Sequence, residues 1–195
     1  NVFATMIANG VGNGRHGINV RGIGATDTRV SFVYPWTGVN GEWHGSTSLA
    51  LNTWYHVLVT YDRGATTNDA IIVLDGGTET ITELTTPIAP VLTGADTVKF
   101  GENAAGSGDF NGMMAEAAYY NRILAASEYG VLAAGYQPLY WPRGLTVYWD
   151  LAGGTRDRIQ GVNAGATGAV LAAHPPKIIP YARRQSNFFA AAAGS

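Results

Sequence analysis

Cysteine is absent from the 195 residues, so neither a disulfide framework nor a thiolate zinc site can form. Charged residues are scarce as well, at 13%, against about 25% in an average soluble domain. With a formal net charge of −2, the chain lacks the cationic excess that neutralises phosphates, and we expect no nucleic-acid partner. No apolar run approaches the roughly 18 residues of a membrane span, so we expect no membrane partner either.

Glycine is abundant, with 26 residues where about 14 would be usual at about 7% usage. Many glycines and few charges are typical of strands and turns, and the length fits one large all-β domain, with or without a tail. The low charge also favours a subunit of something larger, because a lone soluble domain usually carries more charge. A neutral secreted domain is the alternative.

The first part of the chain has strand character. Residues 1–34 read as three strands, separated by glycine-rich turns at 9–14 and 22–27. Residues 29–34 alternate with period two, as a half-buried strand should, and Pro35 ends the run. The chain begins in a strand-like run without methionine, which leads us to expect a processed or truncated N-terminus.

In the middle of the chain we expect one loop and several further strands. The loop spans residues 36–45 and carries two tryptophans. The strands cover residues 54–62, 70–74, 78–83 and 98–101. Asp75–Gly76 is a strong signal for a two-residue hairpin turn. Glu79 and Glu83 share one face of the return strand, which we interpret as solvated surface.

A further strand and the only expected helix follow. The strand starts at Phe110, and the helix covers residues 125–134. Glu128 lies in its first turn, where a carboxylate interacts favourably with the helix dipole. Gly135 stands where a helix commonly ends.

Two stretches, residues 52–62 and 110–124, carry a family resemblance. In this order, with a hairpin between them, they resemble the laminin-G-like jelly-roll domain of the concanavalin A-like lectin/glucanase superfamily. The resemblance implies an all-β, two-sheet antiparallel jelly-roll sandwich with one short helix and a C-terminal extension. Its motif residues, which we expect to be architectural, are Trp54, His56, Asp62, Gly112, Tyr120, Asn121 and Arg122.

His56 lies in the most specific of these motifs. In a strand, Trp54, His56 and Leu58 share one face. His56 could act as a ligand or a base, but we interpret it as a structural residue hydrogen-bonded beside an aromatic ring. The opposite face takes Tyr55, Val57 and Val59.

The turn into the expected helix also matches the family, with one departure. Ala125 stands where relatives usually have a serine that caps the helix. The loss of this cap should cost about 1 kcal/mol of local stability.

Strands near the C-terminus stand in an unusual place. Residues 145–151 and 168–172 read as strands of a pattern that usually opens a laminin-G-like domain. They either complete this chain's own sandwich, as in a circular permutation, or pair with a neighbouring subunit, because an unpaired edge promotes aggregation. We expect a sandwich over residues 1–181, with 145–176 supplying these strands. Residues 182–195 then form an arm or a disordered tail.

Aromatic residues of the expected tryptophan-rich loop are candidates for binding a glycan or a protein partner. Rings of this kind stack on sugars, and they also anchor protein interfaces. The alternative is that they pack against the sheet. The candidates are Tyr34, Trp36, Trp43 and His44.

Calcium is the one cofactor that the resemblance raises, because laminin-G-like and pentraxin relatives often bind it on loops at the rim of the sandwich. Six or more oxygen ligands must converge on such an ion, and the chain has no dense Asp-x-Asp-x-Asp run. The candidates are Asp27, Asp62, Asp69, Asp96, Glu102 and Asp109.

Glycosidase chemistry needs two carboxylates that flank the scissile bond. Glucanase relatives carry theirs on one strand, whereas the corresponding stretch here, residues 113–118, offers Glu116 alone. We therefore expect that the chain is not an enzyme.

The function predicted from these patterns is a non-catalytic structural or interaction module. Its layout resembles laminin-G-like proteins of phages and prophages, so we expect a virion accessory or capsid decoration protein at a virion or extracellular surface. Protein subunits of a larger assembly are the expected partners, and self-association is expected. A glycan-binding lectin domain of an adhesin or tail fibre is the alternative, and a glycoside hydrolase comes third.

Overall fold

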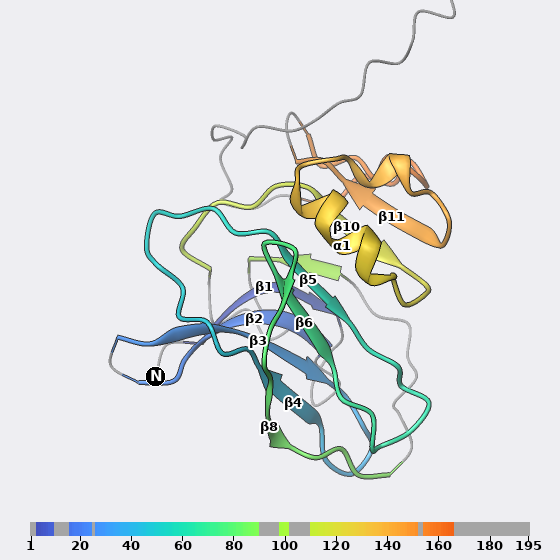
Figure 1. The fold of residues 1–195 in the computed structure, drawn as a ribbon. Helices are drawn as coiled ribbons and strands as arrows, with labels where there is room; N and C mark the ends of the chain where they lie inside the picture. Colours follow the sequence, from blue (N-terminus) through green and yellow to red (C-terminus); the bar gives the residue numbers. More distant parts are fainter. Residues whose placement is uncertain are drawn as a thin grey trace, which may run out of the picture.

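A six-stranded antiparallel sheet forms the larger layer of the fold (Figure 1). The computed structural model describes residues 3–9, 16–24, 26–89, 98–101, 110–151 and 154–165. The strand order of this sheet is β8-β4-β3-β2-β1-β9. The strands are β1 (Phe3–Asn9), β2 (His16–Gly22), β3 (Thr28–Tyr34), β4 (Gly41–His44), β8 (Thr82–Thr85) and β9 (Val98–Phe100).

The second layer consists of a three-stranded sheet, β5-β6-β7, and a two-stranded sheet, β10-β11. In Figure 1, β5 and β6 lie over the blue strands, and α1 and β11 lie at the top right. The elements are β5 (Val57–Thr60), β6 (Ile71–Leu74), β7 (Gly77–Thr78), β10 (Ala117–Tyr120), α1 (Ala126–Ala133), the 3-10 helix η1 (Pro138–Tyr140) and β11 (Leu145–Trp149).

Strand β6 is covered on both faces, and its alternating side chains contribute to two separate apolar clusters. Ile72 and Leu74 pack against Phe32 and Trp43 of the large sheet. Val73, between them, points to the opposite face and packs against Leu132 of α1 and its neighbours. Full burial of an aliphatic side chain contributes about 1.5–3 kcal/mol, so β6 links the two sheets and the helix into one packed body.

The faces predicted for the strand around His56 agree with this packing. Tyr55, Val57 and Val59 pack against the inter-sheet cluster. Leu58 packs against the helix-side cluster.

The predicted hairpin turn after β6 is confirmed. Asp75 and Gly76 have φ values of 49° and 83°, the left-handed pair that a tight two-residue hairpin requires. A Cβ at Gly76 would lie 3.2 Å from the Cβ of Ala133, so glycine also allows α1 to pack closely on this turn.

The predicted helix is confirmed as well. It begins after Ala125, whose side chain makes no capping bond. Its C-terminal end is followed by Gly135 at a φ of 92°, and the Gly135 amide donates to the Leu132 carbonyl at 3.0 Å.

The C-terminal strand β11 pairs with β10 of the same chain, from Ala117↔Trp149 to Tyr120↔Leu145. The Trp149 ring meets the Phe100 ring of β9 edge-on, with centroids 5.1 Å apart. This pair of strands therefore covers the β9 end of the large sheet. The expected strand at 168–172, the rest of the segment to 176 and the arm 182–195 lie outside the described residues.

A turn after β11 covers the outer edge of that strand. The Tyr148 amide donates to the Asp157 carboxylate at 2.9 Å, and the Arg158 amide donates to the Tyr148 carbonyl at 2.7 Å. The turn thus takes up polar backbone groups that an edge strand would otherwise leave open.

Several predicted boundaries are wrong. Residues 36–45 are not one loop, because 41–44 form β4. The expected strand at 54–62 is regular only over β5, and the expected strand from Phe110 is regular only over β10. The return strand divides into β7 and β8, and β8 pairs with β4 in the other sheet.

The predicted fold class is confirmed: the described residues form an antiparallel β-sandwich with one α-helix. Within the same residues, no helix is long and apolar enough to cross a membrane.

Candidate functional site

The predicted aromatic candidates lie mainly in the interior. Trp43, Trp36 and His44 are 0%, 5% and 6% exposed, and Tyr34 is half-buried. The Tyr61 ring lies 5.0 Å from Trp43 and 5.1 Å from Tyr34 between centroids. The prediction that these residues form an exposed loop of stacking rings is therefore wrong, because β4 carries Trp43 into the core.

The calcium candidates within the described residues each have a different partner. Asp27 pairs with Arg29 at 2.6 Å, Asp62 accepts the Gly64 amide at 2.9 Å, and Asp69 accepts Trp43 Nε1 at 2.9 Å. In the described part of the chain, no three His, Cys, Asp or Glu residues gather where they could hold a metal ion. Asp96, Glu102 and Asp109 lie outside the described residues.

The main chain of His56 is tied to the hairpin turn, whereas the buried Nδ1 of its ring has no hydrogen-bond partner within the described residues, so the hydrogen bond expected for the side chain is not found at this nitrogen. The His56 amide donates to the Asp75 carboxylate at 2.8 Å, and the Asp75 amide donates to the His56 carbonyl at 2.9 Å. Burial lowers the pKa of the His56 imidazole. Gly112 has a packing role, because a Cβ there would lie 2.6 Å from the Phe110 ring.

The motif before α1 joins the helix to the strands beside it. The Tyr120 hydroxyl donates to the Pro138 carbonyl at 3.3 Å, and burial raises the pKa of Tyr120 to about 12. The Asn121 amide donates to the Gly144 carbonyl at 2.8 Å. These contacts agree with the architectural role expected for the motif.

Glu116, the carboxylate that the glycosidase comparison singles out, follows an unusual backbone path. It has a φ of 56°, and it accepts a hydrogen bond from the buried hydroxyl of Tyr148. Burial, followed by this hydrogen bond, raises the pKa of Tyr148. The tyrosine is therefore a hydrogen-bond donor that orients the carboxylate.

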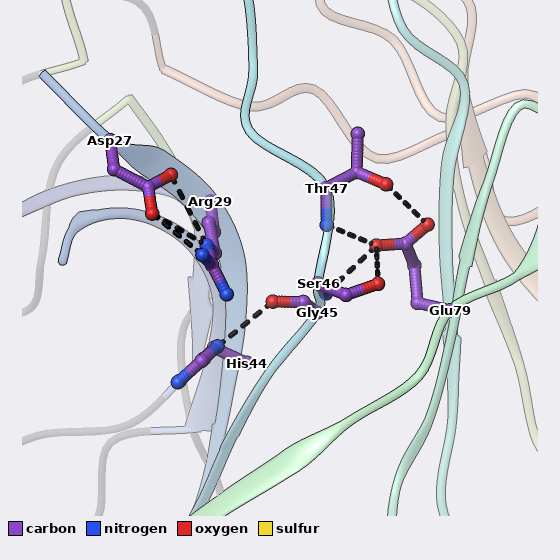
Figure 2. A network of polar contacts seen from close by, with 7 residues as sticks. All are labelled: Asp27, Arg29, His44, Gly45, Ser46, Thr47 and Glu79. Carbon is purple, nitrogen blue, oxygen red and sulfur yellow. Dashed lines mark hydrogen bonds and ion pairs between the residues drawn. The ribbon is translucent and has the colours of Figure 1, made fainter.

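A loop between β4 and β5 is fixed at its base by Glu79 (Figure 2). The Glu79 carboxylate accepts the Ser46 amide at 2.9 Å and the Ser46 hydroxyl at 3.2 Å. It also accepts the Thr47 amide at 2.7 Å and the Thr47 hydroxyl at 2.8 Å. Burial alone would raise the pKa of Glu79, but these bonds outweigh it and lower the pKa. The interpretation of Glu79 as solvated surface is therefore wrong.

More polar groups surround the same base. Figure 2 shows the Asp27–Arg29 pair beside His44, whose Nδ1 lies 2.8 Å from the Gly45 carbonyl oxygen. Asp27 was a calcium candidate and His44 a glycan candidate, and the structure brings them together at this base. The hydrogen bond from Arg29 is the main cause of the lowered pKa of Asp27.

Beyond this base the loop is tied to the sheet and to itself. The Leu49 amide donates to the Thr28 carbonyl of β3 at 2.7 Å. The Ala50 amide donates to the Tyr55 hydroxyl at 2.9 Å. Leu49 and Tyr55 also pack against the inter-sheet core. Both ends of the loop are thus fixed.

The tip of the loop is apolar and exposed. Leu51 is 90% exposed and Trp54 is 41% exposed, and Asn52 between them takes a φ of 57°. Large apolar side chains on a fixed loop can insert into a partner with little loss of conformational entropy. We call Leu51 and Trp54 the apolar tip.

A groove lies at the start of α1, with a volume of about 570 Å³. Its lining includes Arg122, Glu128, Tyr140, Trp141, Pro142 and Arg143. The Trp141 ring meets the Tyr136 ring edge-on at 6.1 Å between centroids. Sequence patterns gave no sign of this groove, because residues 136–143 carry no recognisable motif.

A two-layer sandwich with a fixed apolar loop and a lateral groove defines a binding or structural module. The chain belongs to the family described as the concanavalin A-like lectin/glucanases superfamily, whose model matches residues 3–128. Neither the curated proteins nor the solved structures give a match.

Proposed function

We propose that the chain is a non-catalytic docking module of a larger assembly, and more specifically a virion accessory or capsid decoration protein. The observation that carries this proposal is the apolar tip. A leucine at 90% exposure and a tryptophan at 41% stand on a loop whose base is hydrogen-bonded. Tryptophan is enriched among the residues that dominate protein interfaces.

The composition supports the same proposal. The charged fraction of 13% is low for a surface that faces water on every side. A module that covers part of its surface with neighbouring subunits needs less charge to stay soluble. A virion or extracellular surface is the setting that fits such an assembly.

Two other functions have less support. The residues that suggested glycan stacking, Trp36, Trp43 and His44, are packed in the interior. For a glycosidase, residues 113–118 contain Glu116 alone, whereas the chemistry needs two carboxylates.

The test is incorporation into the native particle. Leu51→Ser and Trp54→Ser should lower the copy number on purified particles at least about tenfold, which corresponds to about 1.4 kcal/mol of docking energy. Val162→Ser is the matched control, because Val162 is a 60% exposed apolar residue elsewhere. Quantitative mass spectrometry of the particles gives the stoichiometry, and thermal unfolding shows that the variants remain folded.

The proposal fails if the tip variants are incorporated as well as the wild type. It also fails if the purified protein releases reducing sugar and loses that activity in Glu116→Gln. Specific retention on a glycan array, without stoichiometric incorporation into any particle, would instead support the lectin alternative.

A further inference from the structure

The groove at the start of α1 is lined by one arginine that has no ion-pair partner among the described residues, although its charge also acts on Glu128. Arg122 and Glu128 neutralise each other through bonds of 2.6 and 2.8 Å. Arg143 also lines the groove, and within the described residues its side chain makes no hydrogen bond or ion pair. A ligand of this groove therefore gains most from a negative charge placed near Arg143.

The rim of the groove is partly apolar. Tyr140, which is 41% exposed, lines it together with Trp141 and Pro142. The groove has a volume of about 570 Å³ and is more open to solvent than enclosed. The groove thus combines a cation with exposed apolar walls.

The free edge of β8 offers the complementary combination. Within the described residues β8 pairs with β4 alone. Glu83 lies opposite Trp43 and Ile88 opposite Val39. These pairings place Glu83 and Ile88 along the same outer edge of the sheet, with a register shift in the ladder between Glu42 and Trp43.

Three of these residues are available to a partner. Val39 is 38% exposed and Ile88 is 57% exposed. Glu83 is exposed as well, and it has no ion-pair partner in the part of the chain that the structure describes. We call Val39, Glu83 and Ile88 the acidic edge.

We infer that the groove of one copy binds the acidic edge of a second copy. Arg143 pairs with Glu83 of the neighbour, and the apolar rim packs against Val39 and Ile88. The occupant is a second copy because the chain itself carries, on the acidic edge, the negative charge that complements Arg143 and the exposed apolar side chains that can pack on the apolar rim. The inference extends the proposed function, and as a role within a particle it rests on that proposal.

One copy cannot close this contact on itself. In Figure 1, β8 lies at the bottom of the sandwich, whereas α1 and β11 lie at the top. Because the groove and the edge are different surfaces, the contact is heterologous and generates a ring or an open array. It would join neighbouring copies side by side and leave the apolar tip for the underlying particle.

The test uses charge reversal on the full chain, followed by sedimentation velocity over a concentration series. The wild type should associate. Arg143→Glu and Glu83→Arg should each weaken self-association at least about tenfold, a change of about 1.4 kcal/mol. Arg156→Glu, at another exposed arginine, makes the same change in net charge and should leave association intact.

Mixing the two single variants gives the sharpest result. The Glu83→Arg copy keeps a wild-type groove, and the Arg143→Glu copy keeps a wild-type acidic edge. Both contacts between the two variants then pair opposite charges, so their mixture should recover the association that each variant alone has lost, and the double variant should recover it as well.

The inference is overturned by a wild type that stays monomeric, by reversals that leave association unchanged, or by a mixture of the two variants that fails to associate. Binding of glucuronate to the groove with no self-association would also overturn it. The two proposals separate cleanly, because variants of the apolar tip should lose particle docking and keep self-association. Charge-reversal variants should lose self-association and keep the ability to dock on the particle as single copies.

Discussion

Arg122 holds Glu128 through two parallel hydrogen bonds of 2.6 and 2.8 Å, across the turn that leads into α1. Glu128 in turn accepts the Ala125 amide at 2.6 Å. One carboxylate therefore joins the helix start to the preceding turn. The hydrogen bonds from Arg122 are the main reason that the pKa of Glu128 falls from 4.5 to about 2.

This lowered pKa predicts an acid-sensitive part of the stability. A carboxylate with a lowered pKa stabilises the folded state fully above its ordinary pKa, and this stabilisation is lost as the pH falls. For Glu128 the loss should occur between about 4.5 and about 2. Urea unfolding at a series of pH values should show that Glu128→Gln lowers stability at pH 6 and flattens the profile in this window. Glu83→Gln, at an exposed glutamate, serves as the control. If the stability profile of Glu128→Gln kept the shape of the wild-type profile and were only displaced from it at every pH, the assignment to Glu128 would be contradicted.

Replacing the missing cap should stabilise the helix. Ala125 has an extended backbone, with φ −79° and ψ 155°, which is the conformation of a capping residue. Ala125→Ser should therefore raise the free energy of unfolding by about 1 kcal/mol. Ala126→Ser places the same hydroxyl one residue later, inside the helix, and should bring no gain in the same urea titration. Equal stability of the two variants would show that the serine does not cap.

Local patterns predict the elements that depend on neighbours a few positions apart. The first three strands, the Asp75–Gly76 turn and the helix belong to this group. Strand β4 does not stand out, because it has four residues and contains Gly41. That glycine is a packing requirement, since a Cβ there would lie 2.2 Å from the Trp43 ring. The glycine that locally indicates a loop is therefore the residue that leaves room for the buried indole of Trp43.

The candidate site could not be predicted for a related reason. Glu79 lies in a run of alternating threonine and glutamate, which locally indicates solvent. Its partners Ser46 and Thr47 are 33 and 32 positions away, and the strands β5, β6 and β7 lie between them and Glu79 in the sequence. The exposure of Trp54 likewise follows from β5 beginning only at Val57. Both features depend on contacts that no local pattern contains.

Removing the charge of Glu79 should loosen the loop that carries the apolar tip. Glu79→Gln leaves one acceptor oxygen for four donors, so we expect a loss of about 1–3 kcal/mol in unfolding free energy. Hydrogen exchange of the Ser46 and Thr47 amides should accelerate as well. Glu83→Gln changes the same chemical group on β8 and should cost less than about 0.5 kcal/mol. If amide exchange in the loop stayed at the wild-type rate, Glu79 would not be the residue that fixes it.

Asp157 should be the residue whose loss most weakens the C-terminal strand. It is 1% exposed, and its carboxylate accepts the amides of Tyr148, Ile159 and Gln160 at 2.9, 3.0 and 2.8 Å. Burial alone would raise the pKa of Asp157, but these three bonds outweigh it and lower the pKa below its ordinary 3.8. The stabilisation is therefore complete near neutral pH and is lost as the pH falls through that lowered value.

Asp157→Asn keeps the shape of the side chain but removes the charge and one acceptor oxygen. We expect it to cost about 2–3 kcal/mol in urea unfolding at pH 7, because hydrogen bonds to a buried charged group are among the stronger ones. Asp62→Asn is the control, because Asp62 is exposed and accepts the Gly64 amide alone. Amide exchange at Tyr148 should rise in Asp157→Asn and stay unchanged in the control. If both substitutions cost the same, the edge of β11 is held by the Arg158 amide and the Tyr148 carbonyl, and Asp157 adds little to it.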